Sequence, residues 1–480
     1  MAAEHKDVLR GPYAPTLIIH GGAGNITRKN LPPDLYEQYK NSLLKYLHST
    51  RDVLLHGASA LDAAVHAVAL MEDDPLFNCG RGSVFTETGT IEMEASVMVA
   101  SVDPERARDE RLTTAHQKRG AGVSLLKNTR HPIQLAREAL LIRPNGTASS
   151  MHCQLSGPEL EQWGWQERGL ERKEDDWFWT KKRWDEHRRG LQMDSANNDT
   201  MPPMQDNSSW NADQDLLPSQ GTVGTVCMDS FGDLCVATST GGLTNKKAGR
   251  LGDTATFGAG FWAENWEDTF RNRDLGCLDR PRAPVTSRLC RAIEAGFSEL
   301  LGSCLPSWFP LRNGYESLSL IASSQPMPRG APPKPNRADH YFTTQRPDRS
   351  CRAVAVSGTG NGDSFLRTAA CRTTAALCRY SRSSPSADLI SLKEAMDLVA
   401  GPGGELQDSA GDRWAVTGEG QAGIIGIEVK GDSDAAAFYC SPHGRRSGRV
   451  LASFNCGGLW RAWFDEKTGT GKVMVFRDEY

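Results

Sequence analysis

The chain lacks any long apolar run, and no stretch approaches the roughly 18 residues that a membrane-spanning helix needs. It also lacks an excess of one charge, since 55 basic residues stand against 59 acidic ones and give a formal net charge of −4. We therefore expect neither a membrane span nor a nucleic-acid partner. Residues 1–15 contain no apolar core of the kind found in secretory leaders, which predicts a cytoplasmic location.

The 12 cysteines are dispersed and show neither CxxC pairs nor the spacing of metal ligands. In a chain of 480 residues this pattern favours a reduced intracellular protein over a disulfide scaffold, and no transition-metal site is expected. A hydrophobic content of 39% is enough to build the core of one large domain or two ordinary ones.

Two apolar runs near the middle of the chain predict a β-hairpin. They cover residues 222–228 and 234–240, and a short glycine-containing loop joins them. Counting outward from the loop brings Thr222 and Thr240 roughly opposite each other. Threonine pairs across strands are common structural features. Thr222 also directly follows Gly221 at the end of a polar segment, and this setting suits cleavage of the chain.

Alternating strand and helix signals on both sides of the hairpin predict a layered fold of the α+β type. Strands are expected at residues 16–19, 91–100, 351–357, 421–429, 435–439, 449–454 and 473–476, and helices at about 36–54 and 60–70, within 120–142, and at about 364–380 and 388–401. Ser59 and Asp62 have the spacing of a helix cap at the start of the second helix.

Two segments differ in composition from the rest of the chain. The stretch at about 191–220 is polar and poor in apolar residues, which suits a disordered linker. It ends directly before the hairpin, so it would let new chain ends separate after a cut at Thr222. The stretch at about 323–350 is rich in proline and arginine and is expected to form a surface loop.

Five short motifs of the chain resemble those of the plant-type L-asparaginase/isoaspartyl peptidase family. The resemblance rests on GTVGTV at 221–226, ATSTGGLTNKKAGRLGD at 237–253, HGGAG at 20–24, LFNCGRGS at 76–83 and VSGTGNGD at 356–363. Members are N-terminal nucleophile (Ntn) hydrolases, related to threonine aspartase and glycosylasparaginase. The resemblance implies an αββα four-layer sandwich made of two chains that are cut from one precursor.

The family mechanism assigns the cut to Gly221 and Thr222. The hydroxyl matching Thr222 attacks the carbonyl of Gly221, an N→O acyl shift gives an ester, and water hydrolyses it. The resemblance thus implies an α chain of residues 1–221 and a β chain of residues 222–480. Cleavage frees the α-amine of Thr222, whose reference pKa of about 7.7–8.0 lets it act as base for its own hydroxyl near neutral pH.

The resemblance also assigns the residues around the nucleophile. Thr240 is implied to hydrogen-bond and orient Thr222, and Asn78 to support it. The hydroxyl of Thr359 and the backbone N–H of Gly360 are implied to stabilise the oxyanion that forms during the reaction.

Recognition of the substrate requires both signs of charge. Arg250 is suited to hold an α-carboxylate in a bidentate pair, and Asp253 is suited to hold an α-ammonium. The expected substrate is therefore a small molecule or dipeptide with a free aspartyl α-amino acid group, whose side-chain carbonyl meets Thr222.

The loop from Met71 to Arg81 resembles the family's alkali-cation loop, in which backbone oxygens hold Na⁺ or K⁺. No other cofactor is expected to be required. The family also suggests that the two chains form an αβ heterodimer, which either associates as (αβ)₂ or stands alone.

Several features depart from the usual family pattern. Glu94 stands where many members carry aspartate, Gln220 precedes the cleavage glycine, and an apparent insertion occupies about residues 266–350. The sequence GFWAEN at 260–265 resembles threonine aspartase. Against that branch, Asp253 favours substrates with a free α-amine, which an aspartate within a protein chain lacks.

The expected function is an autoproteolytically activated threonine hydrolase that cleaves the side-chain amide of L-asparagine, the isopeptide bond of β-aspartyl dipeptides, or both, and releases L-aspartate. A threonine-aspartase-type endopeptidase that cuts after aspartate is the first alternative. An unprocessed, non-catalytic scaffold with the same fold is the second.

Overall fold

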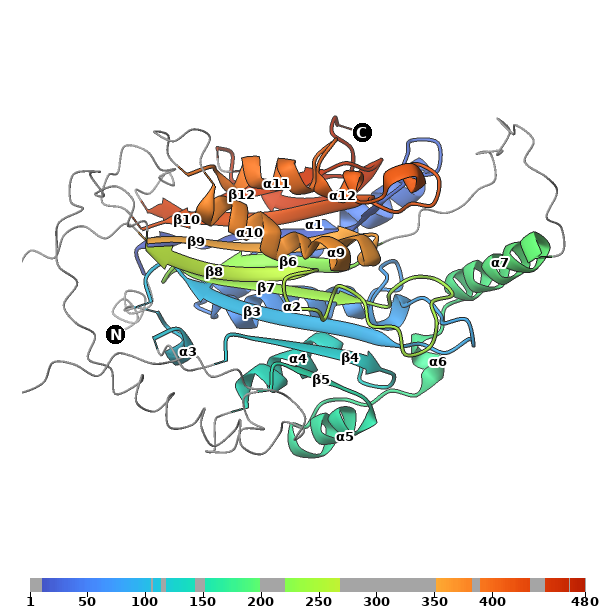
Figure 1. Ribbon diagram of the computed structural model, residues 1–480. Coiled ribbons are helices and arrows are strands. Elements are labelled where there is room, and N and C mark those ends of the chain that lie inside the picture. Colours follow the sequence, from blue (N-terminus) through green and yellow to red (C-terminus); the bar gives the residue numbers. More distant parts are fainter. Residues whose placement is uncertain are drawn as a thin grey trace, which may run out of the picture. The chain divides into compact units, whose positions relative to one another are not determined.

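The computed structural model describes residues 11–104, 107–113, 118–142, 152–198, 221–267, 351–381, 389–431, 445–465 and 467–479. By its internal contacts the chain divides into two units, one formed by Met1–Asp268 with Asp348–Tyr480 and the other by Thr269–Pro347. The described residues all belong to the first unit, which has a mixed α+β fold (Figure 1).

An eight-stranded sheet contains the predicted hairpin. Its strands lie in the order β14, β13, β2, β6, β7, β3, β4 and β5, and only the last pair is parallel. Their bounds are β2 Thr16–Gly24, β3 Met93–Ser101, β4 Gly120–Leu126, β5 Gln154–Ser156, β6 Val223–Met228, β7 Asp233–Thr240, β13 Gly458–Phe464 and β14 Gly471–Met474.

A four-stranded antiparallel sheet has the order β12, β10, β9 and β8. Its strands are β8 Phe261–Glu267, β9 Cys351–Gly360, β10 Ala422–Lys430 and β12 Arg449–Phe454, and a separate parallel pair is formed by β1 Tyr13–Ala14 and β11 Arg446–Ser447.

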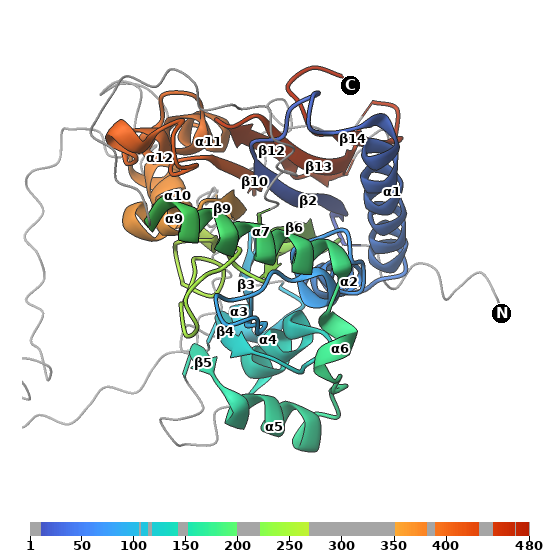
Figure 2. The same cartoon turned by 90° about the vertical axis from the view of Figure 1, so that its right-hand side faces the viewer.

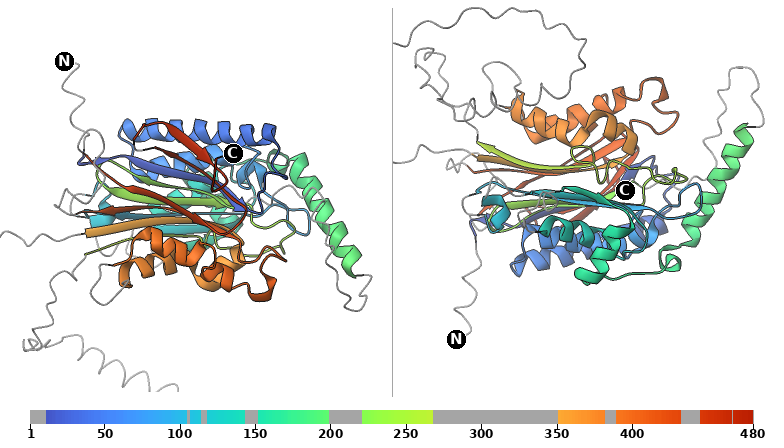
Figure 3. Two further views of the ribbon diagram at one scale, coloured as in Figure 1. Left: turned by 90° about the horizontal axis from the view of Figure 1, so that it is seen from above. Right: turned by 60° about the horizontal axis from the view of Figure 1, so that its bottom comes forward.

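Helices cover one face of each large sheet, as the view from above shows (Figure 3). Helices α1, α2 and α4 contact the eight-stranded sheet, and α10 and α11 contact the four-stranded one. The helices are α1 Pro33–Leu55, α2 Ala60–Glu72, α3 Glu110–Thr113, α4 Pro132–Leu141, α5 Pro158–Glu167, α6 Asp175–Phe178, α7 Lys181–Asn198, α9 Gly362–Thr368, α10 Ala370–Tyr380, α11 Leu392–Ala400 and α12 Glu405–Asp408, with short 3₁₀ turns at Gly80–Gly82 and Gly411–Arg413. Among the described helices, none combines the length and apolar character that crossing a bilayer requires.

The two large sheets pack face to face, because β2, β3, β6 and β7 contact strands of the four-stranded sheet. An apolar cluster between them includes Val226, Val236, Phe261 and Ile425. Such strands are buried on both faces, and β6, β7 and β3 are accordingly buried at every residue instead of alternating between buried and exposed positions. Residues at the ends of these strands therefore lie close to both sheets.

Local sequence signals explain the principal helices. Pro33 begins α1, and the residues that α1 buries recur at helical spacing, from Tyr36 and Tyr39 to Leu54. The Ser59 hydroxyl accepts a hydrogen bond from the backbone N–H of Asp62, so the predicted cap of α2 is confirmed.

Two expected boundaries are wrong. Helix α7 continues to Asn198, so residues 191–198 are helical instead of belonging to a linker that begins at about 191. The helix is anchored by Trp184, whose ring packs edge-on against Phe85 with centroids 5.2 Å apart, and composition alone does not reveal this contact. The helix expected at about 364–380 is divided into α9 and α10 by Ala369, whose φ is +46°, whereas the helix expected within 120–142 is confirmed as α4.

The remaining parts of both irregular segments, and the strand expected at 435–439, lie outside the described residues. Figure 2 faces the end of the molecule at which α7 lies, with the helix in front of the sheets.

Candidate active site

Thr222 lies at the start of β6, where the predicted hairpin is confirmed. Its register pairs Val223 with Ser239, so continuation by one residue brings Thr222 opposite Thr240. Thr222 is 5% exposed and Thr240 is 4% exposed. The two hydroxyl-bearing residues thus sit at the open end of an otherwise buried strand pair.

The hydroxyl of Thr222 has a partner that the sequence interpretation left out. Its Oγ1 lies 2.9 Å from Oγ1 of Thr254, the residue directly after Asp253. Thr240 instead uses its Oγ1 to accept a hydrogen bond of 3.0 Å from the backbone N–H of Gly242. The expected bond from Thr240 to Thr222 is therefore replaced here by the contact with Thr254. The position of Thr254, next to a residue of the expected binding pair, was the available signal.

Thr359 and Gly360 end strand β9 beside the predicted cleavage site. Oγ1 of Thr359 donates to the carbonyl oxygen of Thr222 at 2.8 Å and accepts from the backbone N–H of Ala23 at 3.2 Å. A Cβ on Gly221 would lie 2.5 Å from Thr359 Oγ1 and 3.0 Å from the backbone nitrogen of Gly360. Gly221 thus occupies the space directly in front of both expected oxyanion donors, and only glycine fits there.

Gly360 requires its residue type for conformational reasons. Its φ is +139°, and a Cβ would lie 2.2 Å from the carbonyl oxygen of Gln421. Both observations exclude larger residues. The backbone N–H of Gly360 can therefore approach a reacting group without a side chain in the way.

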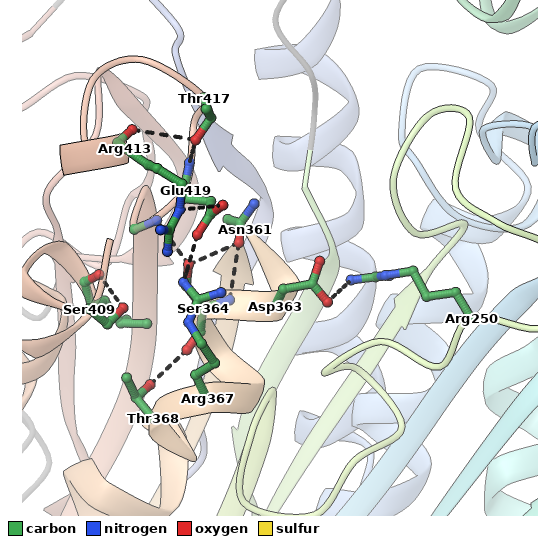
Figure 4. A network of polar contacts seen from close by, with 12 residues as sticks. Arg250, Asn361, Asp363, Ser364, Arg367, Thr368, Ser409, Arg413, Thr417 and Glu419 are labelled. Carbon is green, nitrogen blue, oxygen red and sulfur yellow. Dashed lines mark hydrogen bonds and ion pairs between the residues drawn. The ribbon is translucent and has the colours of Figure 1, made fainter. Parts of the chain in front are cut away.

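Arg250 and Asp253 converge near the start of α9. A Cβ on Gly362 would lie 2.4 Å from Oδ1 of Asp253 and 3.2 Å from Nη2 of Arg250. Nη2 of Arg250 also forms an ion pair of 3.0 Å with Oδ1 of Asp363 (Figure 4). The two residues expected to bind a zwitterionic substrate are thus adjacent, and a third charged residue joins them.

Asp253 is a buried carboxyl group with an unusual titration. Burial, followed by the charge of Glu94, raises the pKa of Asp253 to about 7, and the charge of Arg250 opposes this shift. Its Oδ2 has no hydrogen-bond partner among the described residues. An unsatisfied, buried carboxylate oxygen is suited to receive a cation from a ligand.

One cavity of about 380 Å³ brings most of the predicted residues together. Its lining includes Gly221, Thr222, Thr240, Arg250, Asp253 and Gly360, together with Ala23, Gly24, Asn25, Asn30, Gly242, Leu243, Gly252, Asn361, Gly362, Ala415, Val416, Thr417, Gly418 and Gln421. A volume of this size is typical of small-molecule sites. Hydroxyl, cationic and anionic groups therefore share one solvent-accessible space.

Asn78 lies behind the cavity wall. Its Nδ2 donates to the carbonyl oxygen of Gly242 at 2.8 Å, its Oδ1 accepts from the backbone N–H of Val84 at 3.1 Å, and its carbonyl accepts from Gly241 at 3.0 Å. These bonds fix the chain directly after Thr240, which agrees with a supporting position.

Glu94 connects the strand floor to the charged pair. It lies opposite Thr240 in the pairing of β3 with β7, and its Oε1 accepts from the backbone N–H of Gly252 at 2.5 Å. Burial raises the pKa of Glu94, and the charge of Lys246 opposes the shift. Glu94, which stands where many family members carry aspartate, thus fixes the segment that carries Arg250 and Asp253.

A contact between Ser357 and His20 has the residue types of a serine nucleophile and its base. Nε2 of His20 lies 2.7 Å from Oγ of Ser357, but both residues are 0% exposed. Burial lowers the pKa of His20 to about 3, so the imidazole is neutral. The pair lies between the sheets, where no substrate reaches it.

Two glycines in the loop expected to hold an alkali cation pack directly against backbone carbonyl oxygens. A Cβ on Gly80 would lie 2.2 Å from the carbonyl oxygen of Glu72, and one on Gly82 would lie 2.0 Å from that of Phe77 and 2.8 Å from that of Pro75. Carbonyl oxygens are suitable ligands for hard cations. The described residues contain no cluster of side chains suited to a transition metal.

The sequence is similar to that of proteins from a known family. A profile of the family described as asparaginase matches residues 13–267. An isoaspartyl peptidase of Salmonella typhimurium is 35% identical over 249 residues, covering 52% of this chain and 69% of the relative. An isoaspartyl peptidase/L-asparaginase of Xenopus laevis is 34% identical over 258 residues, covering 52% and 67%. The profile spans just over half of the chain and includes both the hairpin and the segment with Arg250 and Asp253, so the chain belongs to the asparaginase family.

Proposed function

We propose that this chain is a threonine amidohydrolase that cuts itself between Gly221 and Thr222. The mature protein then hydrolyses the side-chain amide of L-asparagine, the isopeptide bond of β-aspartyl dipeptides, or both, and releases L-aspartate. The observation that carries the proposal is the single cavity that Thr222 shares with Arg250, Asp253 and Gly360. The names of the relatives, isoaspartyl peptidase and L-asparaginase, support the same substrates.

The proposal includes the αββα four-layer sandwich of Ntn hydrolases. It is supported by two large sheets that face each other and by helices that contact each of them. After the cut, residues 1–221 and 222–480 form an αβ heterodimer, since β6 and β7 of the second chain pair with β2 and β3 of the first. This αβ unit either associates as (αβ)₂ or stands alone.

In the proposed mechanism the cut creates its own base. The freed α-amine of Thr222 has a reference pKa of about 7.7–8.0 and takes the proton of the Thr222 hydroxyl as that hydroxyl attacks the substrate carbonyl. Thr254, 2.9 Å away, orients this hydroxyl, Thr240 lies opposite Thr222 in the hairpin, and Asn78 holds the chain after Thr240. The leaving group departs as ammonia or an amino acid, and water then hydrolyses the ester.

The Thr359 hydroxyl and the Gly360 N–H stabilise the developing oxyanion. Support comes from Gly221 in the uncut chain, where an added Cβ would lie 2.5 Å from Thr359 Oγ1 and 3.0 Å from the nitrogen of Gly360. Loss of one such donor typically raises the barrier by roughly 2.7–4 kcal/mol. The same pair would serve first the carbonyl of Gly221, for which the Thr359 hydroxyl must leave the carbonyl oxygen of Thr222 that it holds at 2.8 Å, and later the carbonyl of the substrate.

Arg250 and Asp253 hold the α-carboxylate and the α-ammonium of the substrate. The pair places the side-chain carbonyl toward Thr222, because all three residues line the same cavity. This requirement for a free α-amine disfavours the endopeptidase that cuts after aspartate within a chain.

The loop from Met71 to Arg81 would hold Na⁺ or K⁺ through its backbone oxygens. Support comes from Gly80 and Gly82, which pack against the carbonyl oxygens of Glu72, Pro75 and Phe77 and place no side chain in front of them. The cation would stabilise the loop that leads to Asn78. No cofactor takes part in the chemical steps of the proposed mechanism.

Intact-mass measurement and N-terminal sequencing test the self-cleavage. The 52.5 kDa chain should convert into two fragments, the second of which begins Thr-Val-Gly-Thr. Thr222→Ala should leave the chain whole and inactive, and efficient cleavage in that variant would reject the assignment of the nucleophile. An uncut, inactive wild-type chain would support the non-catalytic scaffold.

Parallel assays separate the two enzymatic functions. The purified protein is given L-asparagine, a β-aspartyl dipeptide and a peptide with an internal aspartate. Hydrolysis of the first two is expected, and cleavage of the internal-aspartate peptide alone would favour the endopeptidase.

A further inference from the structure

Arg250 already holds a carboxylate that belongs to the protein. Its Nη2 lies 3.0 Å from Oδ1 of Asp363, which is the second residue of α9 (Figure 4). The Arg250 side chain is 17% exposed and that of Asp363 is 49% exposed. The ion pair therefore lies at the water-accessible edge of the cavity. It can break there because water can solvate both charges.

The position of Asp363 is fixed by the start of α9. The Asn361 side chain caps this helix through the backbone N–H of Ser364, and the Ser364 hydroxyl accepts from the backbone N–H of Gly420 at 2.9 Å. Arg367 continues the network to Glu419 at 2.9 Å. Asp363 is thus presented to Arg250 by a braced helix end.

The charge of Asp363 also acts on the rest of the site. It adds to the negative charge of Glu94 in raising the pKa of Asp253. Since Arg250 is the cation that opposes these charges at Asp253, an incoming α-carboxylate either displaces Asp363 or shares the guanidinium with it. In both cases the negative charge of Asp363 works against the α-carboxylate.

We propose that Asp363 is a specificity-determining residue that competes with the substrate α-carboxylate for Arg250. This inference rests on the proposed function, because it takes Arg250 as the carboxylate-binding residue. With Asp363 present, the site binds the substrate α-carboxylate more weakly than Arg250 alone would. The site therefore favours ligands whose carboxylate binds the Arg250 guanidinium more strongly than the Asp363 carboxylate does.

Asp363→Asn is the principal test, because it removes the charge and keeps an oxygen that can accept from Arg250. The KM for L-asparagine and for a β-aspartyl dipeptide should fall about two- to fivefold, the range expected from an exposed ion pair, and kcat should stay within about twofold. Asp363→Ala should also lower KM. If Asp363 served instead to position Arg250, the alanine variant would raise KM and the asparagine variant would leave it unchanged.

A matched control is Asp412→Asn, which removes an exposed carboxylate from the nearby turn Gly411–Arg413 and should leave KM unchanged. Calorimetry with L-aspartate on the mature protein gives a readout that does not need turnover, and Kd should fall by the same factor in Asp363→Asn. An unchanged or higher KM and Kd in Asp363→Asn, or no binding of L-aspartate to the wild type, would overturn the inference. The proposed function fails separately, if the wild type neither cuts itself nor hydrolyses either substrate.

Discussion

Oγ1 of Thr222 lies 2.9 Å from Oγ1 of Thr254, and both residues are buried. A hydroxyl pair in this setting fixes the rotamer of the attacking oxygen, since a buried hydroxyl without a partner is unfavourable. Thr254 directly follows Asp253, so one short segment both orients the nucleophile and lines the binding site. The geometry of attack and the geometry of binding are therefore coupled through the backbone.

Thr254→Val should slow both self-cleavage and substrate turnover. It keeps the shape of the side chain and removes the hydroxyl, and a hydrogen bond typically contributes about 0.5–1.5 kcal/mol, which corresponds to roughly a two- to twelvefold loss of rate. Thr254→Ser retains the hydroxyl and should restore most of the rate. Time courses of precursor mass and of ammonia release measure the two effects, and equal rates in the valine variant and the wild type would contradict this role.

Gly221→Ala should impair self-cleavage while the chain still folds. The added Cβ would meet Thr359 Oγ1 at 2.5 Å and the nitrogen of Gly360 at 3.0 Å, so Gly221 would have to move away from these two groups. We expect at least a tenfold slower appearance of the two fragments, because the donor pair stabilises the transition state by several kcal/mol. Circular dichroism checks the fold, and cleavage at the wild-type rate would show that Gly221 does not sit at the donors during the reaction.

The pH dependence of kcat/KM should report the charge of Asp253. Its raised pKa, about 7, means that Asp253 becomes negative in the free enzyme only as the pH rises through this value. Binding of an α-ammonium group should therefore improve from pH 6 to pH 8, on top of the increase caused by deprotonation of the Thr222 amine. Succinamate, which lacks the α-amine of asparagine, controls for the second effect. Identical pH profiles for the two amides would argue against Asp253 as the ammonium-binding residue.

Asp233 gives a pH-dependent test of stability away from the cavity. Burial and then the charge of Asp229 raise the pKa of Asp233 to about 7, above its value in the unfolded chain. The stabilising contribution of a raised pKa is complete at low pH and is lost as the pH rises toward 7, at about 1.4 kcal/mol per pKa unit.

Asp233→Asn removes this ionisation. The free energy of unfolding of the variant, relative to the wild type, should therefore rise by about 2.5 kcal/mol from pH 5 to pH 8. Denaturant titrations at both pH values measure it. A constant difference between the two proteins would mean that Asp233 ionises normally in the fold.

Sequence patterns predicted the hairpin well, because strands buried on both faces are short continuous apolar runs with turn residues between them. The register of β6 with β7 then followed from the loop alone. The partner of Thr222 could not be found in this way. Thr254 reaches it from an irregular segment, and no periodicity governs where such a segment places a hydroxyl.

Charge interactions across the fold were equally hidden. Asp363 and Arg250 are far apart in the sequence, and only the end of β9 and the start of α9 bring them to 3.0 Å. The helical continuation to Asn198 was missed for a related reason, since the ring of Trp184 stabilises this helix through a tertiary contact with Phe85. Tertiary contacts of this kind override composition.

The position of Gly221 against Thr359 and Gly360 links maturation of the chain to a correctly formed active site. In the proposed mechanism, the carbonyl of Gly221 in the precursor is the first reacting group that the oxyanion donors must stabilise. A chain in which misfolding or mutation displaces the oxyanion donors would not cleave itself. The nitrogen of its Thr222 would remain in a peptide bond and could not act as the base. Mature enzyme would then consist only of copies that have already carried out the reaction once.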